Sequence, residues 1–242
     1  MDITPEAKKK IQAVLLLAIA VAAMRSGYIL YQRHSEKAKQ TGKIAAPPLD
    51  PDYYVTAKKL YPYDLKSAKQ LTQQPVWVKE GYRYSYYRYE QTRHRTDFSH
   101  DVGQLLPIEK LQIQDVVTDV SPSAPDQRQV MAIFEKEGKS YAFPIGSVRS
   151  GNYQIFSDEM LYLEDPHELY KHWPREVWQA IDSHQAKRGM NEIQMDFAVG
   201  MGVPERSDNP TVKTVHYPHG GNALTVTYRN GRAEEIKPAS TS

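Results

Sequence analysis

Cysteine is absent from this chain of 242 residues. Disulfides, thiol nucleophiles, iron–sulfur clusters and cysteine-ligated zinc are therefore all excluded. Phenylalanine is scarce, with five residues against 17 tyrosines. A tyrosine-rich aromatic set is typical of strands that are partly exposed to solvent, because the hydroxyl group needs a polar partner.

The short motifs of several common enzyme classes are also missing. The sequence has no G-x-S-x-G nucleophile elbow, no H-E-x-x-H zinc helix and no glycine-rich phosphate loop. We therefore expect a protein that is not an enzyme, with no catalytic residue and no cofactor. An anchored hydrolase, or a metal-dependent enzyme built on the middle of the chain, is the alternative.

The charge of the chain is unevenly distributed. Residues 1–43 hold eight Lys/Arg and three Asp/Glu, a net charge of +5, so the remainder carries 23 basic and 26 acidic residues, a net charge of −3. A mildly acidic globular part disfavours general affinity for phosphate backbones. We therefore expect no nucleic-acid partner.

Residues 1–34 have the pattern of a membrane-targeting segment. Lys8-Lys9-Lys10 precede Ile11–Met24, a run of fourteen uncharged and almost wholly apolar residues. A signal peptide cleaved at Ala20-Val21-Ala22 is one interpretation. The other is an uncleaved anchor over Ile11–Gln32, 22 residues long, in which Arg25 extends to the interface. Because apolar residues resume after Arg25, we expect the anchor.

The middle of the chain follows a linker. Residues 35–52 end in Pro47-Pro48-Leu49-Asp50-Pro51, which favours an extended backbone. Residues 53–165 predict a β-rich domain, with a hairpin turn at Glu137-Gly138. Short strands at this spacing indicate a small antiparallel sheet, either an SH3-like barrel or a rolled sheet. The expected strands lie at 81–89, 112–120, 129–135, 139–144, 153–156 and 160–163.

The C-terminal part, residues 166–237, predicts helices followed by strands. A first helix is expected after Pro174, because proline is favoured at the first helical position. A second helix is expected after Gly189, with Ile193, Phe197 and Met201 on its apolar face. Three strands follow, and residues 238–242 form a tail.

The fold class that follows from these patterns is α+β. It combines an N-terminal membrane helix, a small antiparallel β-rich middle domain and a C-terminal ααβββ domain. The last two strands are joined by Asn230-Gly231, a strong hairpin signal.

The C-terminal motif resembles a known family. Gly189-Met190, the helix after it, the exit Gly202-Val203-Pro204 and the hairpin at Asn230-Gly231 are similar to the SmpA/OmlA (BamE-like) domain. That family consists of small bacterial envelope proteins with an ααβββ fold, and the resemblance covers about the last quarter to third of the chain. Two departures stand out: the stretch Gly200–Pro204 is about two residues longer than usual, and without cysteine a lipid-anchored N-terminus is impossible.

The resemblance implies a function and a location. The family is best known as an accessory of outer-membrane protein assembly, so we expect a membrane-anchored, non-enzymatic binding or scaffold module in the envelope. Its expected partners are the membrane, through Ile11–Gln32, and other envelope proteins or peptidoglycan.

The orientation in the membrane is indicated by two opposing signals. Three Lys/Arg precede the apolar core and five follow it, which favours a cytoplasmic C-terminus. The signal-like core and the resemblance favour export. We expect a single-pass inner-membrane protein with a periplasmic globular part; secretion after cleavage, or a cytoplasmic globular part, are the alternatives.

One group of residues has the chemistry of metal ligands. His94, Asp97 and His100 offer imidazole and carboxylate ligands suited to zinc or manganese. No helical spacing brings them to one face, so we expect a solvated polar loop there and no metal.

A second group has the pattern of a partner-binding strand. Tyr82, Tyr84 and Tyr86 alternate along one expected strand face, and Arg88 follows them. Aromatic platforms beside cations also bind single-stranded nucleic acid, but an exposed strand with cation–π contacts is the simpler interpretation. These four residues are the candidate partner-binding set.

Overall fold

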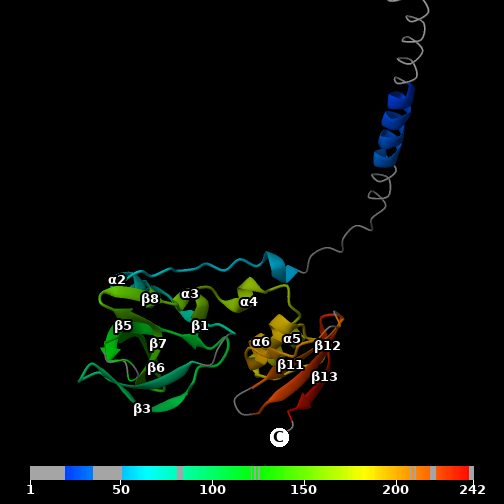
Figure 1. Cartoon of the computed structure of the whole chain (residues 1–242). Helices are drawn as coiled ribbons and strands as arrows, with labels where there is room; N and C mark the ends of the chain where they lie inside the picture. The colour runs from blue at the N-terminus through cyan, green and yellow to red at the C-terminus, as the bar shows by residue number, and fades with distance from the viewer. Residues whose placement is uncertain are drawn as a thin grey trace, which may run out of the picture. The chain divides into compact units, whose positions relative to one another are not determined.

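The computed structural model describes residues 20–34, 51–80, 84–120, 122, 124, 126–207, 209, 211–218 and 222–239. The chain divides into two units, Met1–Asp50 and Pro51–Ser242 (Figure 1). In the first unit, residues 20–34 form one α-helix whose side chains are all exposed. The second unit holds the strands of the described part of the chain.

No helix among the described residues is long and apolar enough to cross a membrane. The prediction of a single-pass inner-membrane protein is wrong on this finding, and so is the membrane helix of the expected fold class. The described helix contains only the later part of the expected anchor Ile11–Gln32, where Arg25 interrupts the apolar run. Residues 11–19 of that anchor and residues 35–50 of the linker lie outside the described residues.

A six-stranded antiparallel sheet forms most of the first half of Pro51–Ser242. Its strands lie in the order β3–β2–β7–β6–β5, and β8 pairs with β7. Short turns join β2 to β3, β6 to β7 and β7 to β8, whereas β2 pairs with β7 across a long stretch of the chain. The bounds are β2 (Ser85–Glu90), β3 (Arg95–Gln104), β5 (Ile113–Val120), β6 (Arg128–Lys136), β7 (Lys139–Arg149) and β8 (Asn152–Ile155).

Short elements form a second layer against this sheet. Three strands pair antiparallel in the order β4–β1–β9. They are β4 (Lys110–Leu111), β1 (Val76–Val78) and β9 (Leu161–Tyr162). Five short helices precede or follow these strands in the sequence: η1 (Pro51–Tyr54), α2 (Leu65–Ala68), η2 (Lys69–Gln73), α3 (Ser157–Met160) and α4 (Pro166–Leu169). Leu71 of η2 and Val76 of β1 are buried in one cluster with Phe134, Phe143 and Ile145 of the large sheet.

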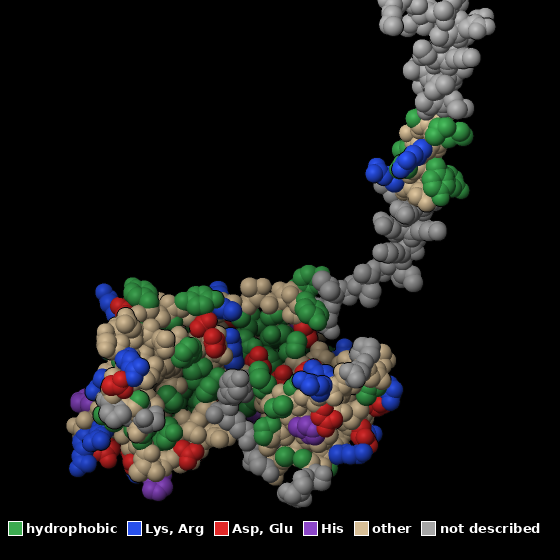
Figure 2. All heavy atoms as spheres, in the orientation of Figure 1, with side chains coloured by type: hydrophobic (Ala, Val, Ile, Leu, Met, Phe, Trp, Pro, Cys, Tyr) green, Lys and Arg blue, Asp and Glu red, His purple; other side chains and the backbone are tan. Residues whose placement is uncertain are grey.

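The C-terminal part consists of two helices followed by a sheet. The helices are α5 (Arg175–Asp182) and α6 (Glu192–Val199), and the strands are β10 (Val203–Pro204), β11 (Val212–Tyr217), β12 (Leu224–Arg229) and β13 (Arg232–Pro238). The four strands pair antiparallel in chain order. On the face drawn in Figure 2, acidic and basic side chains are interspersed and form no wide patch of one sign.

Two-residue turns with positive φ at both positions connect three of the hairpins. Glu137-Gly138 has φ values of 53° and 72°, and Asn230-Gly231 has values of 49° and 75°, so both predicted turns are confirmed. Ser150-Gly151, between β7 and β8, has values of 50° and 82°. This conformation matches the twist of the flanking strands, and glycine adopts it without strain.

The expected fold class is corrected in several respects. The described residues form three antiparallel sheets in place of one small SH3-like or rolled sheet followed by three strands. The expected strand at 160–163 belongs to the separate sheet β4–β1–β9, and β10 adds a fourth strand to the C-terminal sheet. Strand periodicity predicts local structure, whereas the partner of a two-residue strand is chosen by contacts far away in sequence.

The buried face of α6 also differs from the prediction. Phe197 is buried as expected, but Ile193 and Met201 are 38% and 45% exposed. Met201 lies beyond the end of α6, after Gly200. At Ile193 the reason is a capping box: Asn191 accepts a hydrogen bond from the Gln194 amide, and Gln194 Oε1 accepts one from the Asn191 amide. Gln194 is therefore buried at 4% exposure, and the apolar face is turned away from Ile193.

Removing the Phe197 ring should strongly destabilise the C-terminal part. The ring lies 5.1 Å from Tyr170, 5.2 Å from Trp173 and 6.3 Å from Trp178, between ring centroids. We expect Phe197→Ala to cost about 3–5 kcal/mol of unfolding free energy, and the partly exposed control Ile193→Ala less than about 1 kcal/mol. Urea melts of the full-length chain measure both. Equal midpoints for the two variants would show that α6 does not dock through Phe197.

The stability of the C-terminal part should fall between about pH 4 and pH 7. Burial, together with the nearby Glu192 carboxylate, raises the pKa of Asp196 to about 7. Glu80 and the hydroxyl of Tyr217 also act on it, and Lys213 is paired with Glu192 at 2.7 Å. Because the folded state then binds more protons than the unfolded state in this window, stability is lost as the pH rises through it.

The measurement is a set of urea melts at pH 5 and pH 8. Asp196→Asn should remove a part of the pH dependence on the order of 2 kcal/mol, allowing for solvent screening. The variant should also be the more stable protein at pH 8. A variant with the same pH dependence as the wild type would contradict this assignment.

Candidate functional site

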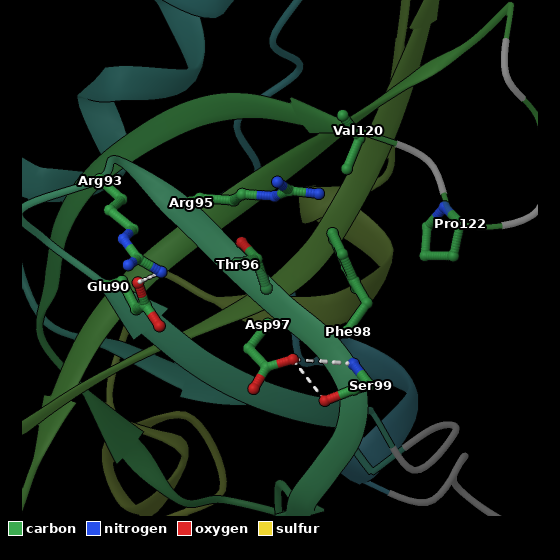
Figure 3. A pocket seen from close by; sticks show the side chains of 9 residues that line it. All are labelled: Glu90, Arg93, Arg95, Thr96, Asp97, Phe98, Ser99, Val120 and Pro122. Carbon is green, nitrogen blue, oxygen red and sulfur yellow. Dashed lines mark hydrogen bonds and ion pairs between the residues drawn. The ribbon is translucent and has the colours of Figure 1, made fainter.

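A hollow of about 520 Å³ lies beside the β2–β3 hairpin and the end of β5 (Figure 3). Segments from both ends of the strand order therefore contribute to it. Its described lining combines charged, hydroxyl and apolar side chains. They are Glu90, Arg93, Arg95, Thr96, Asp97, Phe98, Ser99, Val120 and Pro122.

The shape of the hollow depends on an irregular pairing of β3 with β2. Arg88 of β2 is opposite Asp97, but the next residue, Tyr87, is opposite Asp101. Residues 98–100 therefore bulge out of the ladder. The bulge is held by Asp97, whose Oδ1 accepts hydrogen bonds from the Ser99 amide at 3.0 Å and the Ser99 hydroxyl at 2.5 Å.

A buried carboxylate joins the two outer strands of the sheet. Asp119 of β5 accepts a hydrogen bond from the Thr96 amide of β3 at 2.5 Å, and another from the Val120 amide at 2.7 Å. Asp119 and Thr96 are 4% and 2% exposed. Because β3 and β5 are at opposite ends of the strand order, this contact brings the two edges together and forms one wall of the hollow.

The two arginines of the hollow differ in their partners. Arg93 pairs with Glu90 at 3.4 Å, and Figure 3 shows its side chain bent toward that carboxylate. The backbone of Arg95 pairs with Glu90 in the β2–β3 ladder, but its side chain has no hydrogen bond or ion pair to another residue in the described part of the chain. Its guanidinium extends toward Val120 instead (Figure 3).

The hollow therefore offers an unpaired cation beside an apolar wall. The wall is formed by Phe98, Val120 and Pro122. A guanidinium in this position binds a carboxylate or phosphate through two parallel hydrogen bonds. The hydroxyl oxygen of Thr96 is buried without a hydrogen-bond partner among the described residues, so a polar group of a ligand or a water molecule is needed there.

Asp97 is the lining residue whose proton affinity is changed by its surroundings. Hydrogen bonds from the Ser99 side chain and amide lower the pKa of Asp97 below its usual range. Asp97 is therefore a carboxylate at neutral pH and cannot donate a proton. The Ser99 hydroxyl donates its hydrogen bond to Asp97, so its hydrogen points away from His100, whose Nδ1 lies 3.1 Å from Ser99 Oγ.

The predicted metal residues lie near the hollow without forming a cluster. His94 is an exposed turn residue with φ of 49°, Asp97 lines the hollow, and His100 is exposed in the bulge. No group of three or more His, Asp or Glu side chains suited to a metal ion is found among the described residues. The expected polar loop is also corrected, because residues 95–104 form β3 through hydrogen bonding to β2.

The predicted partner-binding residues do not form an exposed aromatic face. Tyr84 and Tyr86 pack against the main core, and the Tyr86 ring lies 5.6 Å from Phe134. Arg88 is exposed on β2. Tyr82 lies outside the described residues. Alternation correctly places the tyrosines on one side of the strand, but that side faces the core.

The residues that the sequence alone did not single out are those that complete the hollow. Arg95 lies in the Arg- and Tyr-rich stretch that the sequence does emphasise, yet nothing local distinguishes it from Arg93. Val120, Pro122 and Asp119 come from more than twenty residues downstream. Only the contact between β3 and β5 brings them to the hairpin.

The fold and this site together define a β-rich chain with a hollow of mixed charge where β3 meets the end of β5. No family model matches the sequence, and no curated protein or solved structure matches it either.

Replacing Asp119 should separate the two outer strands of the sheet. Asp119→Ala leaves the buried amide of Thr96 and the amide of Val120 without their acceptor, which should cost at least about 2 kcal/mol. The amide hydrogen of Thr96 should also exchange with solvent much faster, as measured by NMR. The control is Asp126→Ala, which removes an exposed ion pair with Arg149 worth about 0–1 kcal/mol. Unchanged exchange at Thr96 would show that this bond does not hold β3 to β5.

Proposed function

We propose that this chain is a non-enzymatic binding module that holds an acidic segment of another protein in the β2–β3 hollow. The observation that carries the proposal is the Arg95 guanidinium, which has no partner among the described residues and faces an apolar wall. A carboxylate satisfies the cation, and an apolar side chain next to it covers Phe98 and Val120.

The energetics favour such a ligand. A hydrogen bond to a charged group contributes about 1.5–3 kcal/mol, and the planar guanidinium can make two to one carboxylate. Specificity comes from the two acidic residues of the lining. Glu90 and Asp97 repel a second carboxylate of the ligand, so a segment with several adjacent acidic residues binds less well. The proposed ligand is therefore one acidic residue flanked by apolar residues.

The resemblance of residues 189–237 to the SmpA/OmlA domain supports a bacterial envelope protein as the partner. In this proposal the C-terminal part is a scaffold, and the hollow in the β-rich part is the contact with the partner. The alternative, a hydrolase or metal-dependent enzyme, is less favoured, because the Ser99 hydroxyl donates its hydrogen bond to Asp97 and not to a histidine base, and the candidate ligand residues are not gathered in the described part of the chain.

The test is a binding titration with three labelled peptides that differ only in charge. Each alternates Phe with Glu, Lys or Gln, and fluorescence anisotropy measures their affinity for the full-length chain. The Glu peptide should bind best and more weakly at high salt. Arg95→Glu should reduce its affinity by about 10- to 100-fold, the equivalent of 1.5–3 kcal/mol.

A matched charge reversal away from the hollow is the control. Arg188 is exposed and lies in the loop between α5 and α6. Arg188→Glu changes the net charge by the same amount, and should leave the affinity within about twofold. Equal affinities for the three peptides, or equal losses in the two variants, would overturn the proposal.

A further inference from the structure

A second hollow, of about 380 Å³, lies at the β7–β8 hairpin and the start of β6. Its lining is polar throughout, with three amide and two hydroxyl side chains and one guanidinium. These are Gln127, Ser147, Arg149, Ser150, Asn152 and Gln154. Val120, Pro122 and the other residues that line the β2–β3 hollow take no part in it.

The strand register places these side chains on one face of the sheet. Ser147 is opposite Gln154, and Arg149 is opposite Asn152. Residues directly opposite each other in an antiparallel pair point to the same side, and so do residues two apart in one strand. The four side chains therefore form a compact square of hydrogen-bonding groups.

A glycine brings the two strands of this hairpin unusually close. A Cβ atom at Gly146 would lie 2.2 Å from the Gln154 carbonyl oxygen and 2.8 Å from Ile155 Cα. Only glycine allows this approach. The backbone contact is made on the opposite side of β7 from Ser147, so it supports the floor of the hollow without filling it.

The hollow carries little net charge. Its one charged lining residue, Arg149, forms an ion pair with Asp126, and its Nε donates to the carboxylate at 2.9 Å. A compensated guanidinium has no need of a further anion. The remaining amides and hydroxyls each offer both a donor and an acceptor. No large apolar side chain is among the described lining residues, so an apolar ligand would gain nothing there.

One acceptor beside the hollow lacks a partner. Gln129 of β6 is directly opposite Ser147, and its Oε1 is buried without a hydrogen bond to any described group. Buried acceptors of this kind are almost always satisfied by a donor from water or a ligand. The row Gln129, Ser147 and Gln154 thus continues the hydrogen-bonding surface across three strands.

We propose that this second hollow binds a neutral saccharide. Sugar hydroxyls are donors and acceptors at once, as amide and hydroxyl side chains are, so each can be matched without any net charge. The volume lies within the range for small-molecule sites. This inference is independent of the proposed peptide site, because the two hollows share no described lining residue.

The test is a titration of the isotope-labelled full-length chain followed by amide chemical shifts. The probes are two saccharides: maltotriose, and triacetylchitotriose, which carries the N-acetyl groups found in bacterial glycan strands. Glutamate and cyclohexanol serve as the charged and the apolar control ligands. One of the saccharides should shift the amides of residues 127, 147 and 149–154 at millimolar concentration. Stronger binding of triacetylchitotriose than of maltotriose would show that the N-acetyl group is recognised.

The variants Asn152→Ala and Gln154→Ala each remove an exposed amide and should weaken saccharide binding by about 5- to 20-fold, about 1–2 kcal/mol. Arg95→Glu, in the other hollow, should leave it unchanged, and thermal melts check that all three variants fold. Binding that survives both amide variants would overturn the proposal. The absence of saccharide shifts, or stronger shifts with glutamate or cyclohexanol, would do so as well.

Discussion

The Asp119 carboxylate is the constraint on which the arrangement of the β-rich part depends. It is buried in β5 and accepts hydrogen bonds from the amides of Thr96 and Val120. A buried polar group is tolerated only when it is well hydrogen-bonded. The sheet meets this need by bringing β3, at one end of the strand order, to β5 at the other. The β2–β3 hollow exists because of that closure.

A second buried carboxylate ties the beginning of Pro51–Ser242 to its C-terminal part. Asp52 of η1 accepts hydrogen bonds from Trp173 Nε1 at 2.6 Å and Asn191 Nδ2 at 2.9 Å, and His172 Nε2 lies 2.6 Å from it. Asn191 is also the cap of α6. One side chain therefore positions both the helix and the tryptophan that packs against Phe197.

Several local features could be predicted from sequence, whereas the two hollows could not. The turns Glu137-Gly138 and Asn230-Gly231 follow from short-range steric rules, and Phe197 is buried as its helical spacing indicates. The face of α6 differs from the helical-spacing prediction at Ile193, because a capping box buries the polar Gln194. Periodicity counts apolar residues, and it cannot register a polar side chain whose hydrogen bonds are satisfied inside.

By itself, the sequence determined which chemistries are impossible and where the chain turns. The absence of cysteine rules out thiol chemistry. Glu-Gly and Asn-Gly pairs determine where two hairpins turn, because a turn of this kind depends only on the residues in it and their neighbours. The tertiary structure decided that His94, Asp97 and His100 are not gathered for a metal, that Tyr86 faces the core, and that Arg95 meets Val120. Each of these depends on which strands lie side by side, and that is settled by packing and buried hydrogen bonds between distant segments.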